Sequence, residues 1–176
     1  DVLIIGGGLV GASLAITLDG LGLDVAMVEA TPAGTLPAVF DQRNLSFAEA
    51  TVNALDALGV MPLLRAPSGR IQRIHISRAG AFGRIRLEAS AHGRDEFGRV
   101  VVARDFGEAL EARLASLRNL TRHRPARFVG LGELHSGVRH VRIADERGEH
   151  DIATRLLVAA DGSRSGVRDA LGIRVH

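Results

Sequence analysis

The chain has 176 residues, of which 46% are hydrophobic and 24% are charged, and its formal net charge is +2. The absence of cysteine excludes disulfides, thiolate metal sites and a thiol nucleophile among these residues. The 22 basic residues are all arginines scattered along the chain and only 3% of residues are aromatic, so the composition argues against nucleic-acid binding.

The hydrophobic residues are spread along the chain. No segment approaches the roughly 20 continuous apolar residues that cross a bilayer, and no positively charged leader precedes the first strand. We therefore expect a globular cytoplasmic protein. Because residue 1 already lies inside a strand and the chain stops soon after a predicted helix, we expect the amino-terminal portion of a longer chain.

The first motif lies at the amino terminus. An apolar strand over residues 1–5 runs into Gly6, Gly8 and Gly11, which have the spacing of a dinucleotide-binding turn. Gly6 permits the tight turn, Gly8 lets a pyrophosphate approach the backbone, and Gly11 lets the next helix pack on the strand. The unpaired N–H groups at the start of that helix would face the phosphates.

The next segments complete a βαβ unit. Leucines on one face predict a helix over residues 10–21, and a second strand is expected over residues 24–29. Glu29 ends this strand 18 residues after Gly11, where a carboxylate can accept hydrogen bonds from a ribose hydroxyl. We interpret the unit as a dinucleotide site, and the alternative is a glycine-rich turn that binds nothing.

Two further helices have predicted caps. Ser46 is followed three residues later by Glu49, a capping-box pattern, so we expect Ser46 to be the N-cap of a helix that reaches residue 58 and ends at Gly59. Asp105 is the expected N-cap of another helix, which runs through residue 117.

Apolar patterns predict further strands and a final helix. The strands are expected near residues 71–76, 85–87, 100–102, 126–131, 138–144 and 152–160, and the helix over residues 166–171. A turn is expected over residues 80–83, and the turn at Asp145–Gly148 predicts a hairpin of the last two strands.

The second motif covers residues 156–168. An apolar strand leads into Asp161 and Gly162 at its carboxyl end, where ligands bind in open α/β sheets. Gly162 allows a ligand to approach the backbone, and Asp161 can accept a hydrogen bond. The alternative is an ordinary turn in which Asp161 caps the following helix.

Together, the two motifs resemble the class A flavoprotein aromatic hydroxylases of the p-hydroxybenzoate hydroxylase type, over essentially the whole chain. Positions 161, 162, 165 and 168 match that family's Asp-Gly motif. The resemblance implies that the glycine turn holds the ADP part of FAD. It also implies that Glu29 binds the adenosine ribose, that the next residue, Ala30, belongs to the same cofactor site, and that Asp161 and Gly162 lie near the pyrophosphate.

Within that family, residues 40–43 and 70–77 look most like the ubiquinone-biosynthesis hydroxylases of the 2-polyprenyl-6-methoxyphenol hydroxylase type. Arg43 matches an arginine beside the flavin, and Arg104 matches a flavin-contacting position more loosely. A solvated surface position is the alternative for both arginines.

The implied fold is α/β. It is a Rossmann-like FAD-binding domain of the glutathione-reductase type with the start of an inserted β-rich substrate domain. We assign residues 1–66 and 99–176 to two segments of the FAD-binding domain and residues 67–98 to the insertion.

The implied function is that of an FAD-dependent monooxygenase. Such an enzyme uses NAD(P)H and O₂, through a flavin C4a-hydroperoxide, to hydroxylate a phenolic, polyprenylated ring in ubiquinone biosynthesis. A lipid-tailed substrate implies association with the inner-membrane surface or with a ubiquinone-biosynthesis complex. The alternatives are another FAD- or NAD(P)-dependent oxidoreductase and a non-catalytic dinucleotide-binding domain.

No side chain is identified as catalytic from the sequence. The seven histidines show neither an i, i+4 pair nor an HxH spacing, so we expect solvated positions for them and no metal site.

Overall fold

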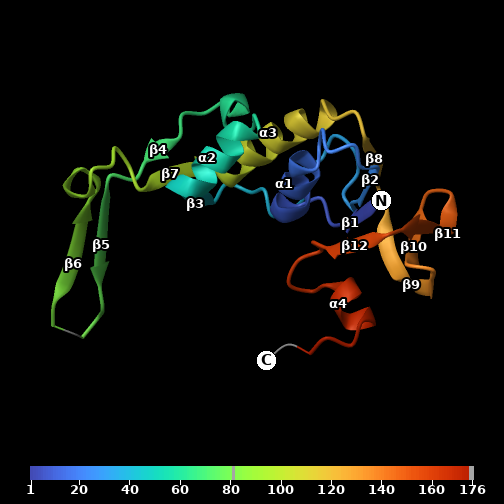
Figure 1. The fold of residues 1–176 in the computed structure, drawn as a ribbon. Helices are drawn as coiled ribbons and strands as arrows, with labels where there is room; N and C mark the ends of the chain where they lie inside the picture. The colour runs from blue at the N-terminus through green and yellow to red at the C-terminus, as the bar shows by residue number, and fades with distance from the viewer. Residues whose placement is uncertain (81, 175–176) are drawn as a thin grey trace. The chain divides into compact units, whose positions relative to one another are not determined.

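The computed structural model describes residues 1–80 and 82–174, so Ala81 of the expected turn and His176 lie outside the described residues. The chain divides into two compact units, both drawn in Figure 1. The first comprises Asp1–Phe40 with Leu110–His176, and the second comprises Asp41–Ala109. The domain limits expected from the sequence, at residues 66 and 98, stay a prediction.

The first unit contains a parallel sheet with the strand order β12-β1-β2-β8. Its strands comprise Val2–Ile5 (β1), Val25–Val28 (β2), Leu120–His123 (β8) and Leu156–Ala159 (β12). All of β1 is buried, because an apolar strand between two parallel neighbours is covered on both faces. Helix α1 (Leu9–Thr17) connects β1 with β2 and contacts both strands. The predicted βαβ unit is therefore confirmed, with a shorter helix.

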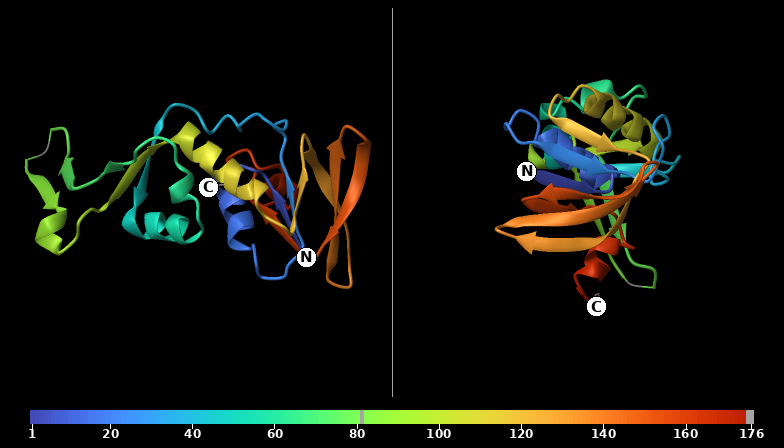
Figure 2. Two further views of the ribbon diagram at one scale, coloured as in Figure 1. Left: turned by 90° about the horizontal axis from the view of Figure 1, so that it is seen from above. Right: turned by 90° about the vertical axis from the view of Figure 1, so that its right-hand side faces the viewer.

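An antiparallel sheet completes the first unit and is seen in orange in Figure 2. Its strands, in the order β11-β10-β9, comprise Arg127–His135 (β9), Val138–Asp145 (β10) and Gly148–Thr154 (β11). Asp145 and Gly148 are the last paired residues of β10 and β11 before the turn, which confirms the predicted hairpin.

The two sheets share one core. The buried cluster joins residues of the parallel sheet, of β10, of helix α4 (Gly166–Ala170) and of the segment just before β9, namely Leu3, Ile5, Val28, Ala126, Val141, Ile143 and Val167. Burying these apolar side chains supplies the main driving force for folding and holds the ends of β1, β2 and β12 in place.

The second unit is built from short strands and helices. Its three-stranded sheet has the order β3-β7-β4, and its β5–β6 hairpin is antiparallel. The elements are β3 (Asn44–Ala48), α2 (Glu49–Ala57), the 3₁₀ helix η1 (Met61–Leu63), β4 (Gly69–Arg70), β5 (Arg73–Ser77), β6 (Arg84–Glu88), the 3₁₀ helix η2 (Ala89–His92) and β7 (Gly98–Val102). Helix α3 (Ala103–Ala115) begins in this unit and ends in the first. Among the described residues, no helix combines the length and apolar character needed to cross a membrane.

Both predicted helix caps are wrong. Ser46 lies within β3 and pairs with Val100 of β7, and helix α2 starts at Glu49 after Ala48. Pairing along the whole of β3 outweighs the local capping box. Asp105 lies inside the first turn of α3, where its carboxylate accepts hydrogen bonds from the backbone N–H groups of Arg65 and Ala66 at 3.0 and 3.1 Å.

The single strand expected over residues 152–160 is two strands in two sheets. β11 ends at Thr154 and β12 begins at Leu156, and Arg155 between them donates its backbone N–H to the Asp1 carbonyl. The apolar run continues across this break, so the pattern alone could not reveal the change of sheet.

Candidate functional site

The glycine turn places Gly6 against the end of β12. Gly6 has a φ of +106°, and a Cβ there would collide with the Ala160 carbonyl oxygen and lie 2.9 Å from the Asp161 Cα. The carbonyl of Val28 accepts the Gly6 N–H at 2.8 Å, which links the turn to the end of β2. Glycine is therefore required at this position for both its backbone conformation and its space.

Gly11 and Gly8 have different surroundings. A Cβ on Gly11 would collide with the Gly6 carbonyl oxygen, so Gly11 allows α1 to pack closely on β1. A Cβ on Gly8 would meet only Val39 Cγ1 at 3.8 Å, so the protein leaves the space above Gly8 open. This open space lies at the start of α1.

The amino terminus of α1 is available to an anion. Gly8 is the N-cap, with an extended backbone at φ −71° and ψ −168°, and no side chain among the described residues caps the helix. The first turn also carries no acidic residue. Backbone N–H groups and the positive end of the helix dipole can therefore bind a phosphate group there.

Glu29 is a buried carboxylate, 9% exposed, at the end of β2. Its Oε2 accepts the Gly7 N–H at 2.7 Å and its Oε1 accepts the Thr31 N–H at 2.7 Å. Each oxygen keeps a lone pair for a further donor such as a ribose hydroxyl. Glu29 thus fixes the glycine turn, and its contact with a ribose stays a prediction.

Gly7 is a site residue that the sequence reasoning missed. Its N–H is one of the two donors to Glu29, and a Cβ on Gly7 would lie 3.0 Å from the Glu29 Oε2. The run of three consecutive glycines was visible in the sequence. Its middle member could be assigned only once Glu29 was placed beside it.

Asp161 lies in the turn after β12, beside Gly6. Its Oδ2 accepts the Val167 N–H at 3.3 Å, whereas its Oδ1 is buried without a hydrogen-bond partner among the described residues. A buried carboxylate oxygen without a donor is costly, so this atom fits a donor supplied by a ligand. Gly162, at φ +84°, has no atom within 4 Å of an added Cβ and leaves that side open.

The other matched positions of the Asp-Gly motif have structural roles. The Ser165 hydroxyl accepts the Arg168 N–H at 3.0 Å and caps α4, and the Arg168 Nη1 donates to the Ser163 carbonyl at 2.8 Å. Ser165, rather than Asp161, is therefore the N-cap of this helix. Asp161 also contributes to capping, because its Oδ2 accepts the N–H of Val167 in the first turn of α4, so the alternative interpretation as a cap applies to this oxygen and the ligand role to Oδ1.

The structure therefore brings five predicted residues to one edge of the sheet, namely Gly6, Gly8, Gly11, Glu29 and Asp161. Ala30 is exposed and lines an open hollow of about 350 Å³ together with Arg127 and Asp145. At this edge, Asp161 Oδ1 has no donor among the described residues, the glycine turn leaves open space, and no described side chain caps the start of α1. These features suit the pyrophosphate and the ribose of FAD.

Arg43 and Arg104 lie in the second unit. Helix α3 starts beside the 41–43 segment, because the Arg104 N–H donates to the Asp41 carbonyl at 2.8 Å and the Ala103 N–H to the Arg43 carbonyl at 2.9 Å. Hydrogen bonds from Arg43 lower the pKa of the Asp41 carboxyl to about 2. Both arginine side chains are exposed, so their flavin contact stays a prediction.

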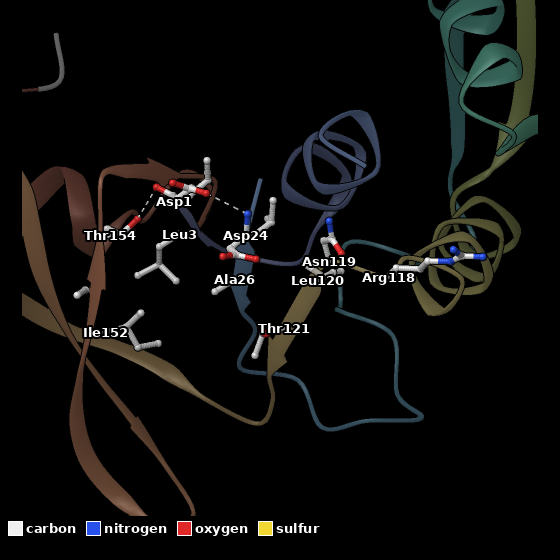
Figure 3. Close-up of a pocket in the computed structure, with 13 residues that line it drawn as sticks. Asp1, Leu3, Asp24, Ala26, Arg118, Asn119, Leu120, Thr121, Ile152 and Thr154 are labelled. Atoms are coloured by element: carbon white, nitrogen blue, oxygen red, sulfur yellow. Dashed lines mark hydrogen bonds between the residues drawn. The ribbon is translucent and has the colours of Figure 1, made fainter. Parts of the chain in front are cut away.

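A second hollow of about 340 Å³ lies at the opposite edge of the parallel sheet (Figure 3). It is lined by the amino-terminal ends of β1, β2 and β8, and Thr154 donates its hydroxyl to the Asp1 carbonyl at 3.0 Å beside it. Ligands of open α/β sheets bind at the carboxyl ends of the strands, so we assign the dinucleotide to the glycine turn and not to this hollow.

Comparison with curated proteins gives relatives over the whole chain. The ubiquinone hydroxylase UbiL of Rhodospirillum rubrum is 34% identical over 177 residues, covering 100% of this chain and 40% of UbiL. The 3-demethoxyubiquinol 3-hydroxylase of Escherichia coli is 28% identical over 185 residues, covering 100% of this chain and 44% of that enzyme. The chain thus spans less than half the length of these relatives.

Solved structures share the fold. The p-nitrophenol 4-monooxygenase PnpA from Pseudomonas putida DLL-E4 matches with a TM-score of 0.79 at 20% identity, over 97% of this chain and 43% of that chain. The anhydrotetracycline hydroxylase OxyS from Streptomyces rimosus matches with a TM-score of 0.78 at 26% identity, over 99% of this chain and 34% of that chain.

The family model described as an FAD binding domain matches residues 1–176. This match confirms the predicted α/β fold class and the resemblance that the two motifs indicated. The chain belongs to the FAD binding domain family that includes flavoprotein aromatic hydroxylases.

Proposed function

We propose that this protein is an FAD-dependent monooxygenase that hydroxylates a phenolic ring, with NAD(P)H as reductant and O₂ as oxygen source. The observation that carries the proposal concerns one edge of the parallel sheet. Among the described residues, no group donates to Asp161 Oδ1 and no side chain caps the start of α1 at this edge. The names of the two curated relatives, both hydroxylases of ubiquinone-type compounds, support the reaction class.

Several residues could bind FAD in the conformation that the structure shows. The open space above Gly8 would receive the pyrophosphate, Glu29 would accept the ribose hydroxyls, and Asp161 would accept a further donor from the cofactor. Ala30, Gly162, Arg43 and Arg104 are proposed to complete the cofactor contacts. Bound FAD supplies electron transfer from NAD(P)H and the activation of O₂, while the protein supplies binding and orientation.

The finer proposal concerns the substrate. We infer a polyprenylated phenol on the way to ubiquinone, because the two relatives named for ubiquinone and demethoxyubiquinol hydroxylation match this chain along its whole length. Such a substrate resides in lipid, so the proposal includes peripheral association with the cytoplasmic face of the inner membrane or with a ubiquinone-biosynthesis complex.

The domain assignment is proposed on the same basis. Residues 1–66 and 99–176 would form the FAD-binding domain, and residues 67–98 would begin the substrate domain. The largely exposed β5–β6 hairpin falls within residues 67–98 and supports this assignment.

The test is turnover by the full-length protein with ¹⁸O₂. We expect NAD(P)H oxidation that is stimulated by a short-chain prenylated phenol, with one ¹⁸O atom in the hydroxylated product. A simple phenol serves as the control for the prenyl tail. Oxidation of NAD(P)H without ¹⁸O in any aromatic product would indicate another oxidoreductase, and FAD binding without turnover would indicate a non-catalytic domain; either would overturn the proposal.

A further inference from the structure

Two histidines and an aspartate from three strands converge in the first unit. His123 ends β8, Asp145 ends β10, and His150 lies in β11. The hairpin register pairs His150 with Ile143, two residues before Asp145, so His150 and Asp145 project from the same face. The His123 carbonyl accepts the Glu29 N–H at 3.0 Å, which fixes the end of β8 beside the end of β2.

The distances among the three side chains are close to those of a metal site. One potential ligand atom from each lies within 4.8 Å of the other two, and the His150 Nε2 lies 3.8 Å from the Asp145 Oδ2. Zinc bonds of about 2.0–2.2 Å in a tetrahedral site place ligand atoms about 3.4 Å apart. Each side chain would therefore move its ligand atom by less than about 1 Å, which small χ rotations provide.

The ligand types in this group also suit a metal ion. Neutral imidazole and carboxylate are the forms in which these side chains bind metals, and two imidazoles with one carboxylate suit a borderline ion such as Zn²⁺.

Arg147 is the competing partner in this group. Its Nη2 lies 3.0 Å from the Asp145 Oδ2, and its side chain is 76% exposed. An ion pair with so exposed a guanidinium contributes little to stability, so the guanidinium can move into solvent when a cation binds.

We propose that His123, Asp145 and His150 form a binding site for a divalent transition-metal ion, with Zn²⁺ as the reference ion. The ion would join the β10–β11 hairpin to the end of β8, next to the strand end that carries Glu29. With three protein ligands, the ion keeps an open coordination position for water. The sequence could not indicate this site because its three ligands come from three strands at irregular spacing.

The first experiment is a Zn²⁺ titration of the full-length protein by calorimetry, with Co²⁺ absorption as a readout of tetrahedral geometry. We expect one Zn²⁺ per chain and visible Co²⁺ bands that Zn²⁺ abolishes. His123→Ala and His150→Ala should each weaken affinity at least about tenfold. The control His135→Ala, an exposed histidine at the end of β9, should leave affinity unchanged.

Arg147→Ala supplies a test in the opposite direction. Removing the guanidinium frees the Asp145 Oδ2, while the backbone N–H of residue 147 still donates to Oδ1, and it removes a positive charge beside the ion, so Zn²⁺ should bind several-fold more tightly. Thermal unfolding without metal identifies any variant that fails to fold, and Arg147→Ala keeps the proposal testable in that case. Equal affinity of all four variants and the parent protein, or no Zn²⁺ binding, would overturn the proposal.

Discussion

Gly6 and Gly8 belong to one turn, but a side chain added at Gly6 and one added at Gly8 would have different surroundings. At Gly6 an added Cβ would collide with the Ala160 carbonyl, and the backbone has a positive φ. At Gly8 the space is open and the backbone is extended, so any residue could adopt its conformation. The first glycine is therefore required for folding, and the second is free to serve a ligand.

Gly6→Ala should lower the free energy of unfolding by about 2 kcal/mol or more, since it adds backbone strain and a collision with β12. Urea denaturation measures the loss. Gly137→Ala is the matched control, because Gly137 also has a positive φ of +79° but no atom within 4 Å of an added Cβ. Equal losses in the two variants would contradict the close approach of Gly6 to β12.

Gly8→Val should lower the free energy of unfolding by no more than about 1 kcal/mol, the usual cost of a poorer N-cap residue, and abolish FAD binding, because the side chain would fill the space proposed for the pyrophosphate. FAD titration and urea denaturation measure the two effects separately. Gly130→Val in β9 is the control, since Gly130 also has open space around an added Cβ. Stoichiometric FAD in the Gly8→Val protein would refute the pyrophosphate assignment.

Asp161→Ala should weaken FAD binding or slow flavin reduction by at least about tenfold, since it removes the acceptor that lacks a donor. Stopped-flow reduction by NAD(P)H and FAD titration give the two quantities. Asp169→Ala, an exposed aspartate of α4, is the control. If Asp161→Ala matched the parent in both measurements, Asp161 would be a residue of a structural turn only.

At the level of elements, one buried arginine organises the loop that follows Glu29. The Arg124 side chain is 6% exposed and donates to the carbonyls of Thr31, Pro32 and Thr35 at 3.1, 2.9 and 2.9 Å. It also pairs with Glu111 of α3 at 3.0 Å. Arg124 thus connects the loop to a helix and holds the backbone beside the proposed ribose site.

Arg124→Met keeps much of the side-chain volume but removes every donor to the loop. We expect a loss of about 2 kcal/mol in the free energy of unfolding, because three loop carbonyls and Glu111 lose the charged donor that the buried Arg124 side chain supplies. Thermal and urea denaturation measure it. Arg142→Met, which breaks the exposed pair with Asp151, is the control and should cost clearly less than Arg124→Met. Similar losses for both would show that the loop does not depend on Arg124.

The elements that could be predicted from the sequence are those with strong local patterns. The β1–α1–β2 unit and the β10–β11 hairpin combine apolar periodicity with glycine or turn residues. β8 was missed because Leu-Thr-Arg-His has no apolar run, and it forms by pairing with the edge of β2. Ser46 was misassigned because its pairing with Val100 depends on a segment more than fifty residues away.

The residues of the candidate sites likewise fall into those that a local sequence pattern predicts and those that it does not. Glycine spacing and a strand-end acid point to Gly6, Gly8, Gly11 and Glu29, since the chemistry of a dinucleotide turn is local. Gly7, Arg124 and the convergence of His123 with His150 depend on contacts between distant segments. No local pattern encodes those contacts.

For the whole molecule, the account rests on FAD at the edge of the parallel sheet that carries Gly8 and Asp161. The most direct test is to purify the full-length protein, denature it, and identify the released cofactor by chromatography and mass. The account predicts FAD in a one-to-one ratio with the chain. Release of NAD(P), or no bound nucleotide even after incubation with FAD, would contradict it.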